Sequence, residues 1–154
     1  MSNKKLKQQQ KHNKISIPQT EDMSERQEIT ISFKYLINNK KYTFDYFNAS
    51  EKDNQLSTMI GLYNRLTELT KRTWHECQLL RKGVPNGFEK IYRNSLNVNI
   101  DNKDVLKHEK LYVVRFDTFM GTNKGRIIGF KEKNNPTFYI ICFEFDYSAY
   151  NHGS

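Results

Sequence analysis

The stretch GRIIGFKEKNNPTFYIICFEFD, residues 125–146, decides the fold of this chain. Two dense apolar runs flank Asn134, Asn135 and Pro136, which are residue types that favour turns. The stretch therefore predicts two strands joined by a short connection. The second run is apolar at almost every position from Phe138 to Phe143, which predicts a strand that is central in a sheet or covered on both faces.

Further strands are predicted on both sides of the middle of the chain. KLYVVRFD, residues 110–117, is a third C-terminal strand. Near the other end, ITISFKYLI (29–37) alternates apolar and polar side chains, and KYTFDYF (41–47) resumes the alternation after a polar turn at 38–40. This pattern predicts an antiparallel hairpin with one buried face.

Two helices are predicted between these strands. Residues 52–71 carry an apolar stripe at helical spacing and should form an amphipathic helix packed on the sheet. The stripe consists of Leu56, Met59, Ile60, Tyr63 and Leu66, widened by Leu62 and Leu69. Thr73 and Glu76 match the T-x-x-E capping box, which begins a second helix that extends to about residue 82. The pattern of residues 83–109 is the least informative: the recurring Asn residues favour loop, and Phe88, Ile91 and Tyr92 could anchor a short turn of helix.

Together these elements predict an α+β protein. We expect a single, mainly antiparallel sheet of about five strands with two helices packed on one face. Along the chain the order is strand, strand, helix, helix, strand, strand, strand. Residues 28–154 form the domain, and residues 1–27 are predicted to be a disordered basic tail and linker.

Positive charge is concentrated near the beginning of the sequence. The formal net charge is +8, and residues 1–18 hold five of the 25 Lys and Arg residues and no acidic residue. The remaining 20 basic residues stand against 17 acidic ones, a net charge of +3. A Lys-rich arm of this kind attracts polyanions such as nucleic acid through counterion release. A solubilising tail is the equally weighted alternative.

Several classes of chemistry lack their motifs. The sequence has no glycine-rich phosphate loop, no G-x-S-x-G and no Cys/His cluster, so nucleotide hydrolysis, serine chemistry and zinc are unsupported and no cofactor or metal is expected. Cys77 and Cys142 stand in apolar surroundings and are expected to be buried, reduced thiols. No apolar run approaches the roughly 20 residues that span a bilayer, and no secretion signal is recognisable. We therefore expect a cytoplasmic protein with no membrane partner.

Residues 29–146 resemble a group of uncharacterised small bacterial proteins. The resemblance rests on ISFKYL, on LYNRLTELTKRTWHE, and on GRIIGF followed by NPTFYIICFEFD. Members of this group typically close with an Asp-Pro-x-His segment. Here Asp146 matches that segment, whereas Tyr147 and Ala149 replace its Pro and His.

The C-terminal part also resembles RelE/ParE-type toxins, small basic proteins with two helices against an antiparallel sheet. YVVRF, RIIGF, FYIICF and Tyr150 echo the last hairpin of that family. The resemblance implies cleavage of messenger RNA at the ribosome by Lys, Arg and Tyr side chains, with Arg126 as the hairpin arginine and Tyr150 as the terminal tyrosine. The family's His-Arg pair is replaced by Tyr147 and Ser148.

RNA cleavage through the 2′-hydroxyl needs a base, an acid and stabilisation of the charge on phosphorus. Arg126 and Tyr150 are the candidate catalytic residues, and Tyr147 and His152 are further groups able to exchange protons. In the alternative interpretation Arg126 is an arginine at a sheet end, the tyrosines cap the core, and His152 is frayed.

A basic stretch beside Tyr92 is typical of single-stranded nucleic-acid binding, in which bases stack and phosphates pair with cations. The candidate nucleic-acid-binding residues are Arg72, Arg81, Lys82, Arg93 and Lys124. The alternative is an ordinary solvated helix end, where the helix dipole favours cations.

The leading hypothesis is therefore a small basic protein associated with RNA or another nucleic acid, and in its most specific form a RelE-like RNase toxin. The alternative hypothesis is a non-catalytic interaction protein encoded by a mobile element or phage. Its partner would be an antitoxin or a host protein.

Overall fold

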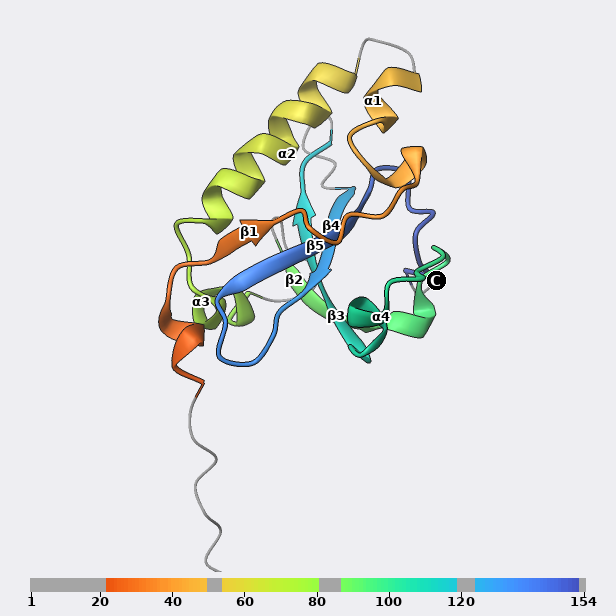
Figure 1. The fold of residues 1–154 in the computed structure, drawn as a ribbon. Coiled ribbons are helices and arrows are strands. Elements are labelled where there is room, and N and C mark those ends of the chain that lie inside the picture. Colours follow the sequence, from red (N-terminus) through yellow and green to blue (C-terminus); the bar gives the residue numbers. More distant parts are fainter. Residues whose placement is uncertain (1–21, 50–53, 81–86, 119–123, 153–154) are drawn as a thin grey trace, which may run out of the picture.

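The computed structural model describes residues 22–49, 54–80, 87–118 and 124–152, and these form one mixed sheet with helices on it (Figure 1). The described part of the chain contains a five-stranded sheet in the order β1-β5-β4-β3-β2. The strands are β1 (Thr30–Ser32), β2 (Phe88–Tyr92), β3 (Lys110–Phe116), β4 (Gly125–Phe130) and β5 (Thr137–Glu144). β2, β3, β4 and β5 pair with one another in antiparallel orientation, while β1 runs parallel to β5.

The helical segments are mostly short. They are η1 (Met23–Arg26), η2 (Lys40–Tyr42), α1 (Tyr46–Ala49), α2 (Gln55–Leu69), α3 (Trp74–Gln78), η3 (Arg93–Ser95) and α4 (Lys103–Leu106). The predicted α+β class, the single mainly antiparallel sheet and the three C-terminal strands are confirmed. None of the described helices is both long and apolar enough to cross a membrane.

The predicted opening hairpin is wrong. Only Thr30–Ser32 forms a strand, at the sheet edge and parallel to β5, and residues 40–49 form η2 and α1 with a turn between them. The alternating side chains do not share one face: Ile29 packs with the helices, whereas Ile37 packs on the opposite face of the sheet. The Ile37 amide also donates to the Ile141 carbonyl at 2.9 Å. The alternation thus reflects a segment that passes from one face of the sheet to the other along the edge of β5.

The Asn-rich region 83–109 supplies strand β2, at the residues for which the sequence suggested a loop or a short turn of helix. All five of its residues pair with β3, from Phe88 opposite Val114 to Tyr92 opposite Lys110. Charged residues at 89 and 90 interrupt the apolar pattern and conceal the strand in the sequence. The short segments η3 and α4 follow it.

Residues 22–27, predicted as part of a linker, contain η1. The Asp22 carboxylate caps this turn and accepts a hydrogen bond from the Lys131 ammonium at 2.6 Å. This contact with Lys131 is the main cause that holds the pKa of Asp22 below its ordinary value. The predicted basic tail, residues 1–18, lies outside the described residues.

Each face of the sheet carries its own hydrophobic core. α2 and α3 cover one face, on which Trp74, Phe116, Phe138 and other apolar side chains are buried. η2, the segment 96–105 and the residues after β5 cover the other face, where Ile141 is fully buried. β5 contributes side chains to both cores, so the prediction that this strand is covered on both faces is confirmed.

The capping box and the reduced cysteines are confirmed. Thr73 and Glu76 exchange hydrogen bonds at the start of α3, with the Thr73 amide donating to the Glu76 carboxylate at 2.7 Å. The adjacent Trp74 is 1% exposed, and its Nε1 donates to the Pro136 carbonyl at 2.8 Å, which ties α3 to the β4–β5 turn. Cys77 and Cys142 are buried free thiols.

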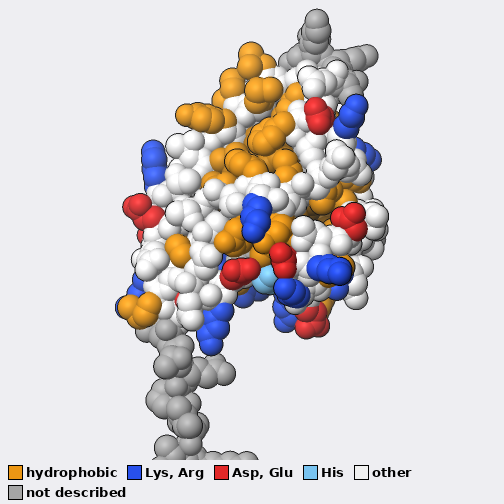
Figure 2. Space-filling model, viewed as in Figure 1, with side chains coloured by type: hydrophobic (Ala, Val, Ile, Leu, Met, Phe, Trp, Pro, Cys, Tyr) orange, Lys and Arg blue, Asp and Glu red, His pale blue; other side chains and the backbone are white. Residues whose placement is uncertain are grey.

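α2 exists as predicted but is rotated relative to the predicted buried stripe. Its buried residues are Thr58, Leu62, Arg65 and Leu69. Four apolar residues expected to face the core are instead exposed, by 45–67%: Leu56, Met59, Ile60 and Tyr63. Figure 2 shows hydrophobic side chains gathered on the surface where α2 lies in Figure 1.

Polar and steric contacts explain this rotation. The Thr58 hydroxyl donates to the Thr118 carbonyl, and the buried Arg65 pairs with Glu68 at 2.7 Å. Between them, Gly61 packs so closely on the end of β3 that a Cβ atom would lie 1.9 Å from the Asp117 carbonyl oxygen. The side of α2 with the small and polar residues therefore faces the sheet.

We expect Gly61→Ala to destabilise the protein although Ala favours helices. The added methyl group must push α2 away from β3, and overpacking of this kind costs about 1–3 kcal/mol. Asn64→Ala on the exposed side of the same helix is the matched control and should change stability little. Urea unfolding measures both, and an unchanged or raised midpoint for Gly61→Ala would contradict the packing of α2 on Asp117.

Candidate functional site

A row of charged side chains crosses the sheet on the face opposite α2 and α3. By strand alternation Glu89, Arg115, Arg126 and Glu144, one from each of β2 to β5, project on this face. Arg126 stands directly opposite Arg115 in β3 and opposite Glu144 in β5. Glu89 is 9% exposed, Arg126 2% and Glu144 0%, so three of the four charges are buried. Buried charges are costly unless they are paired, so the row is a specialised feature of the sheet.

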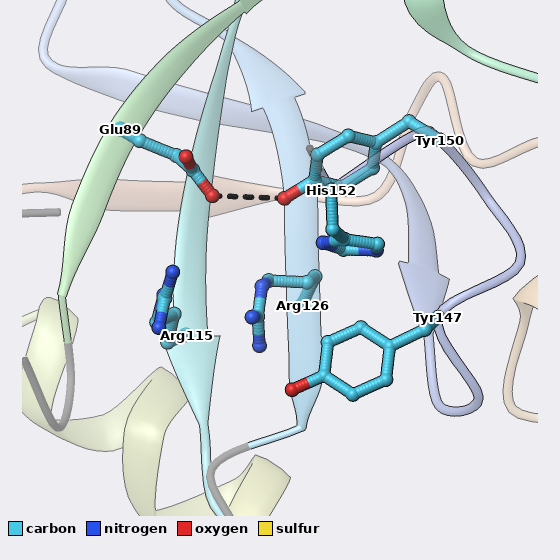
Figure 3. A pocket seen from close by; sticks show the side chains of 6 residues that line it. All are labelled: Glu89, Arg115, Arg126, Tyr147, Tyr150 and His152. Atoms are coloured by element: carbon cyan, nitrogen blue, oxygen red, sulfur yellow. Dashed lines mark hydrogen bonds between the residues drawn. The ribbon is translucent and has the colours of Figure 1, made fainter. Parts of the chain in front are cut away.

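The segment that follows β5 folds back over this row and forms a second wall. Tyr147, Tyr150 and His152 line a pocket together with side chains of the sheet (Figure 3). We name it the arginine pocket, with a volume of about 290 Å³ and the lining residues Glu89, Arg115, Arg126, Tyr147, Tyr150 and His152. The Asn97 amide donates to the Ala149 carbonyl at 2.7 Å, which holds this segment against the loop after β2.

Glu144 joins the 146–152 segment to the sheet. Its Oε1 accepts a hydrogen bond from the Ala149 amide at 2.7 Å and lies 2.9 Å from His152 Nε2. Its Oε2 is buried without a hydrogen-bond partner among the described residues. His152 is therefore not frayed, because a buried carboxylate fixes one ring nitrogen and the rings of Tyr147 and Tyr150 pack against it.

The two arginines bring two positive charges side by side. Arg126 Nη1 donates to the Gly125 carbonyl at 2.9 Å, and its guanidinium carbon lies 5.2 Å from the centre of the Tyr147 ring. The Arg115 side chain lines the pocket, and its Nε is buried without a hydrogen-bond partner among the described residues. Like charges directly opposite on neighbouring strands are destabilising. An anion bound against Arg115 and Arg126 would relieve this repulsion.

Tyr150 lies on the opposite side of the pocket from Tyr147. Its hydroxyl donates to Glu89 Oε1 at 2.8 Å. Burial, followed by the hydrogen bond to Glu89 and the charge of that carboxylate, raises the pKa of Tyr150 well above its ordinary value. Tyr150 therefore keeps its proton at neutral pH and can donate a hydrogen bond or a proton, whereas it cannot serve as a base.

The structure brings the two predicted catalytic residues, Arg126 and Tyr150, into the same pocket. The predicted nucleic-acid contacts do not form one cluster around it. Arg72 pairs with Glu68 at 2.7 Å beside α2, and Arg93 donates to the His108 carbonyl at 3.1 Å beyond the end of β2. Lys124 lies two residues before Arg126, at the opposite end of the sheet from Arg93, about 26 Å along the strands. Arg81 and Lys82 lie outside the described residues.

Sequence reasoning missed Glu89, Arg115 and Glu144. Arg115 and Glu144 were visible as single charges inside apolar strands, in YVVRF and in CFEF. Such charges are retained only where other groups satisfy them, so their presence was a usable signal. Glu89 could not be found in this way because its strand was not recognised.

Other chemistries have no counterpart in the described residues. They contain no group of three or more His, Cys, Asp or Glu side chains placed to hold a metal ion. Burial raises the pKa of the Cys142 thiol, so this cysteine is no nucleophile at neutral pH. No protein family matches the chain, and no curated protein sequence or solved structure is significantly similar to it.

We expect Glu144→Ala to destabilise the protein and to release the 146–152 segment. The change leaves the Ala149 amide without its acceptor and removes the partner of His152, and breaking a buried pair typically costs about 3 kcal/mol or more. Chemical unfolding and amide hydrogen exchange of residues 146–152 measure the two effects. Glu132→Ala, at an exposed position, is the control and should change neither. Unchanged exchange in Glu144→Ala would contradict the anchoring role of this carboxylate.

Proposed function

We propose that the arginine pocket binds a phosphodiester of RNA and cleaves it through the neighbouring 2′-hydroxyl. The observation that carries this proposal is the adjacent pair Arg115 and Arg126 beside a carboxylate–histidine pair, Glu144 and His152. The first pair supplies positive charge for a phosphate, and the second supplies a proton acceptor. This is the most specific form of the leading hypothesis from the sequence, here with a proposed role for each group.

Two neighbouring guanidinium groups suit a phosphate better than a carboxylate. Each guanidinium presents several N–H donors in a plane and can bind two phosphate oxygens at once. Glu89 and Glu144 lie in the same charged row, but Glu89 accepts from Tyr150 and Glu144 accepts from Ala149. Arg115 lines the same pocket, and its Nε–H donor is not used by any described residue.

In the proposed reaction His152 takes the proton of the 2′-hydroxyl, whose oxygen then forms a bond to the adjacent phosphorus. The bond from phosphorus to the 5′-oxygen breaks, and this oxygen takes a proton from the Tyr150 hydroxyl. The products are a 2′,3′-cyclic phosphate and a 5′-hydroxyl. Glu144 orients the imidazole and stabilises the positive charge that it gains, while Arg115 and Arg126 stabilise the charge on the phosphorane.

Tyr150 is able to fill the acid role because it is protonated before the reaction starts. Its raised pKa makes it a weak acid, but the departing 5′-alkoxide is a stronger base than a phenolate. Glu89 fixes the position of the hydroxyl at 2.8 Å. The net charge of the whole chain, +8, adds a general attraction for RNA that is independent of sequence.

We expect the purified protein to cleave single-stranded RNA, alone or on ribosomes, to fragments with 2′,3′-cyclic phosphate and 5′-hydroxyl ends. His152→Ala should lower the cleavage rate by about 100- to 10,000-fold, the usual contribution of a general base. Arg115→Gln should lower it by about 100- to 1,000-fold through lost charge stabilisation. Denaturing gels and end-group analysis of the fragments measure both effects.

Lys103→Gln, on the exposed surface of α4, removes one positive charge away from the pocket and controls for the loss of net charge. A single-stranded DNA of the corresponding sequence should remain intact because it lacks the 2′-hydroxyl nucleophile. Intact RNA at high protein concentration, or full activity of His152→Ala, would rule out the proposed reaction.

A second candidate function, binding of a protein partner, is favoured by the exposed side of α2. We propose that this side binds an apolar helix of a partner protein. Leu56, Met59, Ile60 and Tyr63 follow the i, i+3, i+4, i+7 spacing of a helix-binding stripe. No charged residue occurs between Gln55 and Asn64, so the matching surface should also be uncharged. The pocket and the stripe lie on different sides of the molecule, so the two functions are compatible.

We expect the product of an adjacent antitoxin-like gene, where there is one, to co-purify with the natural chain. Replacing two stripe residues with charges, in Met59→Asp with Tyr63→Asp, should abolish the association because the charges lose their hydration on binding. His152→Ala should retain the association, since it alters the pocket alone. Association that survives the double substitution would contradict binding at the α2 stripe.

A further inference from the structure

Tyr147 has a backbone conformation that bulky side chains rarely adopt. Its φ is 60°, in the left-handed region that favours glycine. Neighbouring contacts hold this geometry: Asp146 accepts hydrogen bonds from both the amide and the hydroxyl of Ser148, and it pairs with Lys41 at 3.2 Å. Strain of this kind costs on the order of 1 kcal/mol and persists where the surrounding structure imposes it. A turn needed only for its shape would be better served by glycine at this position.

The Tyr147 ring is not part of either hydrophobic core. It is 40% exposed, and it lines the arginine pocket (Figure 3). The Arg126 guanidinium lies 5.2 Å from its centre, and the His152 ring meets it at an interplanar angle of 79°. The strained backbone therefore places an exposed aromatic ring beside the proposed phosphate site instead of burying it.

We propose that Tyr147 is a stacking platform for one unpaired nucleobase, whose flanking phosphate binds at Arg115 and Arg126. Bases of single-stranded RNA offer their faces to aromatic side chains, whereas bases inside a duplex are already stacked on their neighbours. The substrate class is accordingly single-stranded RNA. This inference rests on RNA binding in the proposed function but does not depend on cleavage.

The test uses binding of a short single-stranded RNA that carries 2′-O-methyl groups throughout and one 2-aminopurine base. The methyl groups block cleavage, so the measurement reports binding alone. With the natural chain, stacking should quench the 2-aminopurine fluorescence. Tyr147→Phe should retain the quenching, whereas Tyr147→Ala should lose it and bind about 5- to 150-fold more weakly, the range typical of one stacked base. The corresponding duplex should bind more weakly than the single strand and show no change in Tyr147→Ala.

Two further variants distinguish a loss of base stacking from a loss of folding. Tyr147→Gly removes the ring and also relieves the backbone strain, so it should lose the quenching while its melting temperature stays near that of the natural chain or rises. Tyr63→Ala removes a 67% exposed tyrosine from α2 and should bind like the natural chain. A Tyr147→Ala or Tyr147→Gly variant with unchanged affinity and quenching would overturn the proposal, as would absence of single-strand binding by the natural chain.

The result also distinguishes this inference from the proposed reaction. Tyr147-dependent quenching without cleavage of unmodified RNA would retain the stacking site and remove the RNase activity. If unmodified RNA is cleaved but substitution of Tyr147 leaves the quenching unchanged, the RNase activity is retained and the stacking site is ruled out.

Discussion

The candidate site depends on one buried carboxylate. Glu144 ends β5 with no exposed surface, in a strand whose neighbouring side chains are almost all apolar. A charge in this position is costly unless hydrogen bonds compensate it. The compensation comes from the chain itself, which turns back after β5 so that the Ala149 amide and His152 reach the carboxylate. This return places Tyr147, Tyr150 and His152 over the sheet, and without it the charged row would face solvent and no pocket would form.

Stability alone does not explain the charged row. Apolar residues of similar size in place of a buried ionic group often leave a protein equally or more stable. Arg115 and Arg126 stand directly opposite each other, which adds repulsion to the cost of burial. Tyr147 adds a strained backbone at the edge of the same pocket. Three unfavourable features within one pocket are expected where function, and not folding, selects the residues. The proposed anion-binding site is a function of this kind.

The sequence predicted those parts of the fold that are determined locally. β3, β4 and β5 are long apolar runs with clear turns, and Thr73 with Glu76 makes a capping box through neighbouring residues. The errors lie where contacts between residues far apart in the sequence determine the structure. Thr58, Gly61 and Arg65 rotate α2 through their contacts with the end of β3 and with Glu68, and no periodicity within the helix reveals this. The apolar alternation of 29–37 is satisfied by two different cores and not by one strand face. Arg126 and Tyr150 were candidates from the sequence, but Glu89, which accepts a hydrogen bond from the Tyr150 hydroxyl, lies in a strand that only pairing with β3 makes recognisable.

The same two-sided architecture separates the pocket from the exposed stripe of α2. The sheet lies between them: α2 packs on one face, and the arginine pocket opens on the other. A protein bound along Leu56, Met59, Ile60 and Tyr63 would therefore leave the pocket uncovered. It could alter chemistry there only through the sheet, and the contact of Gly61 with the end of β3 is the direct connection, since Arg115 lies two residues before Asp117 in the same chain segment. Displacement of α2 would move the end of β3 and with it Arg115, one of the two arginines in the proposed phosphate site. Control by a partner on this side would thus act through the position of Arg115 and not by blocking the site.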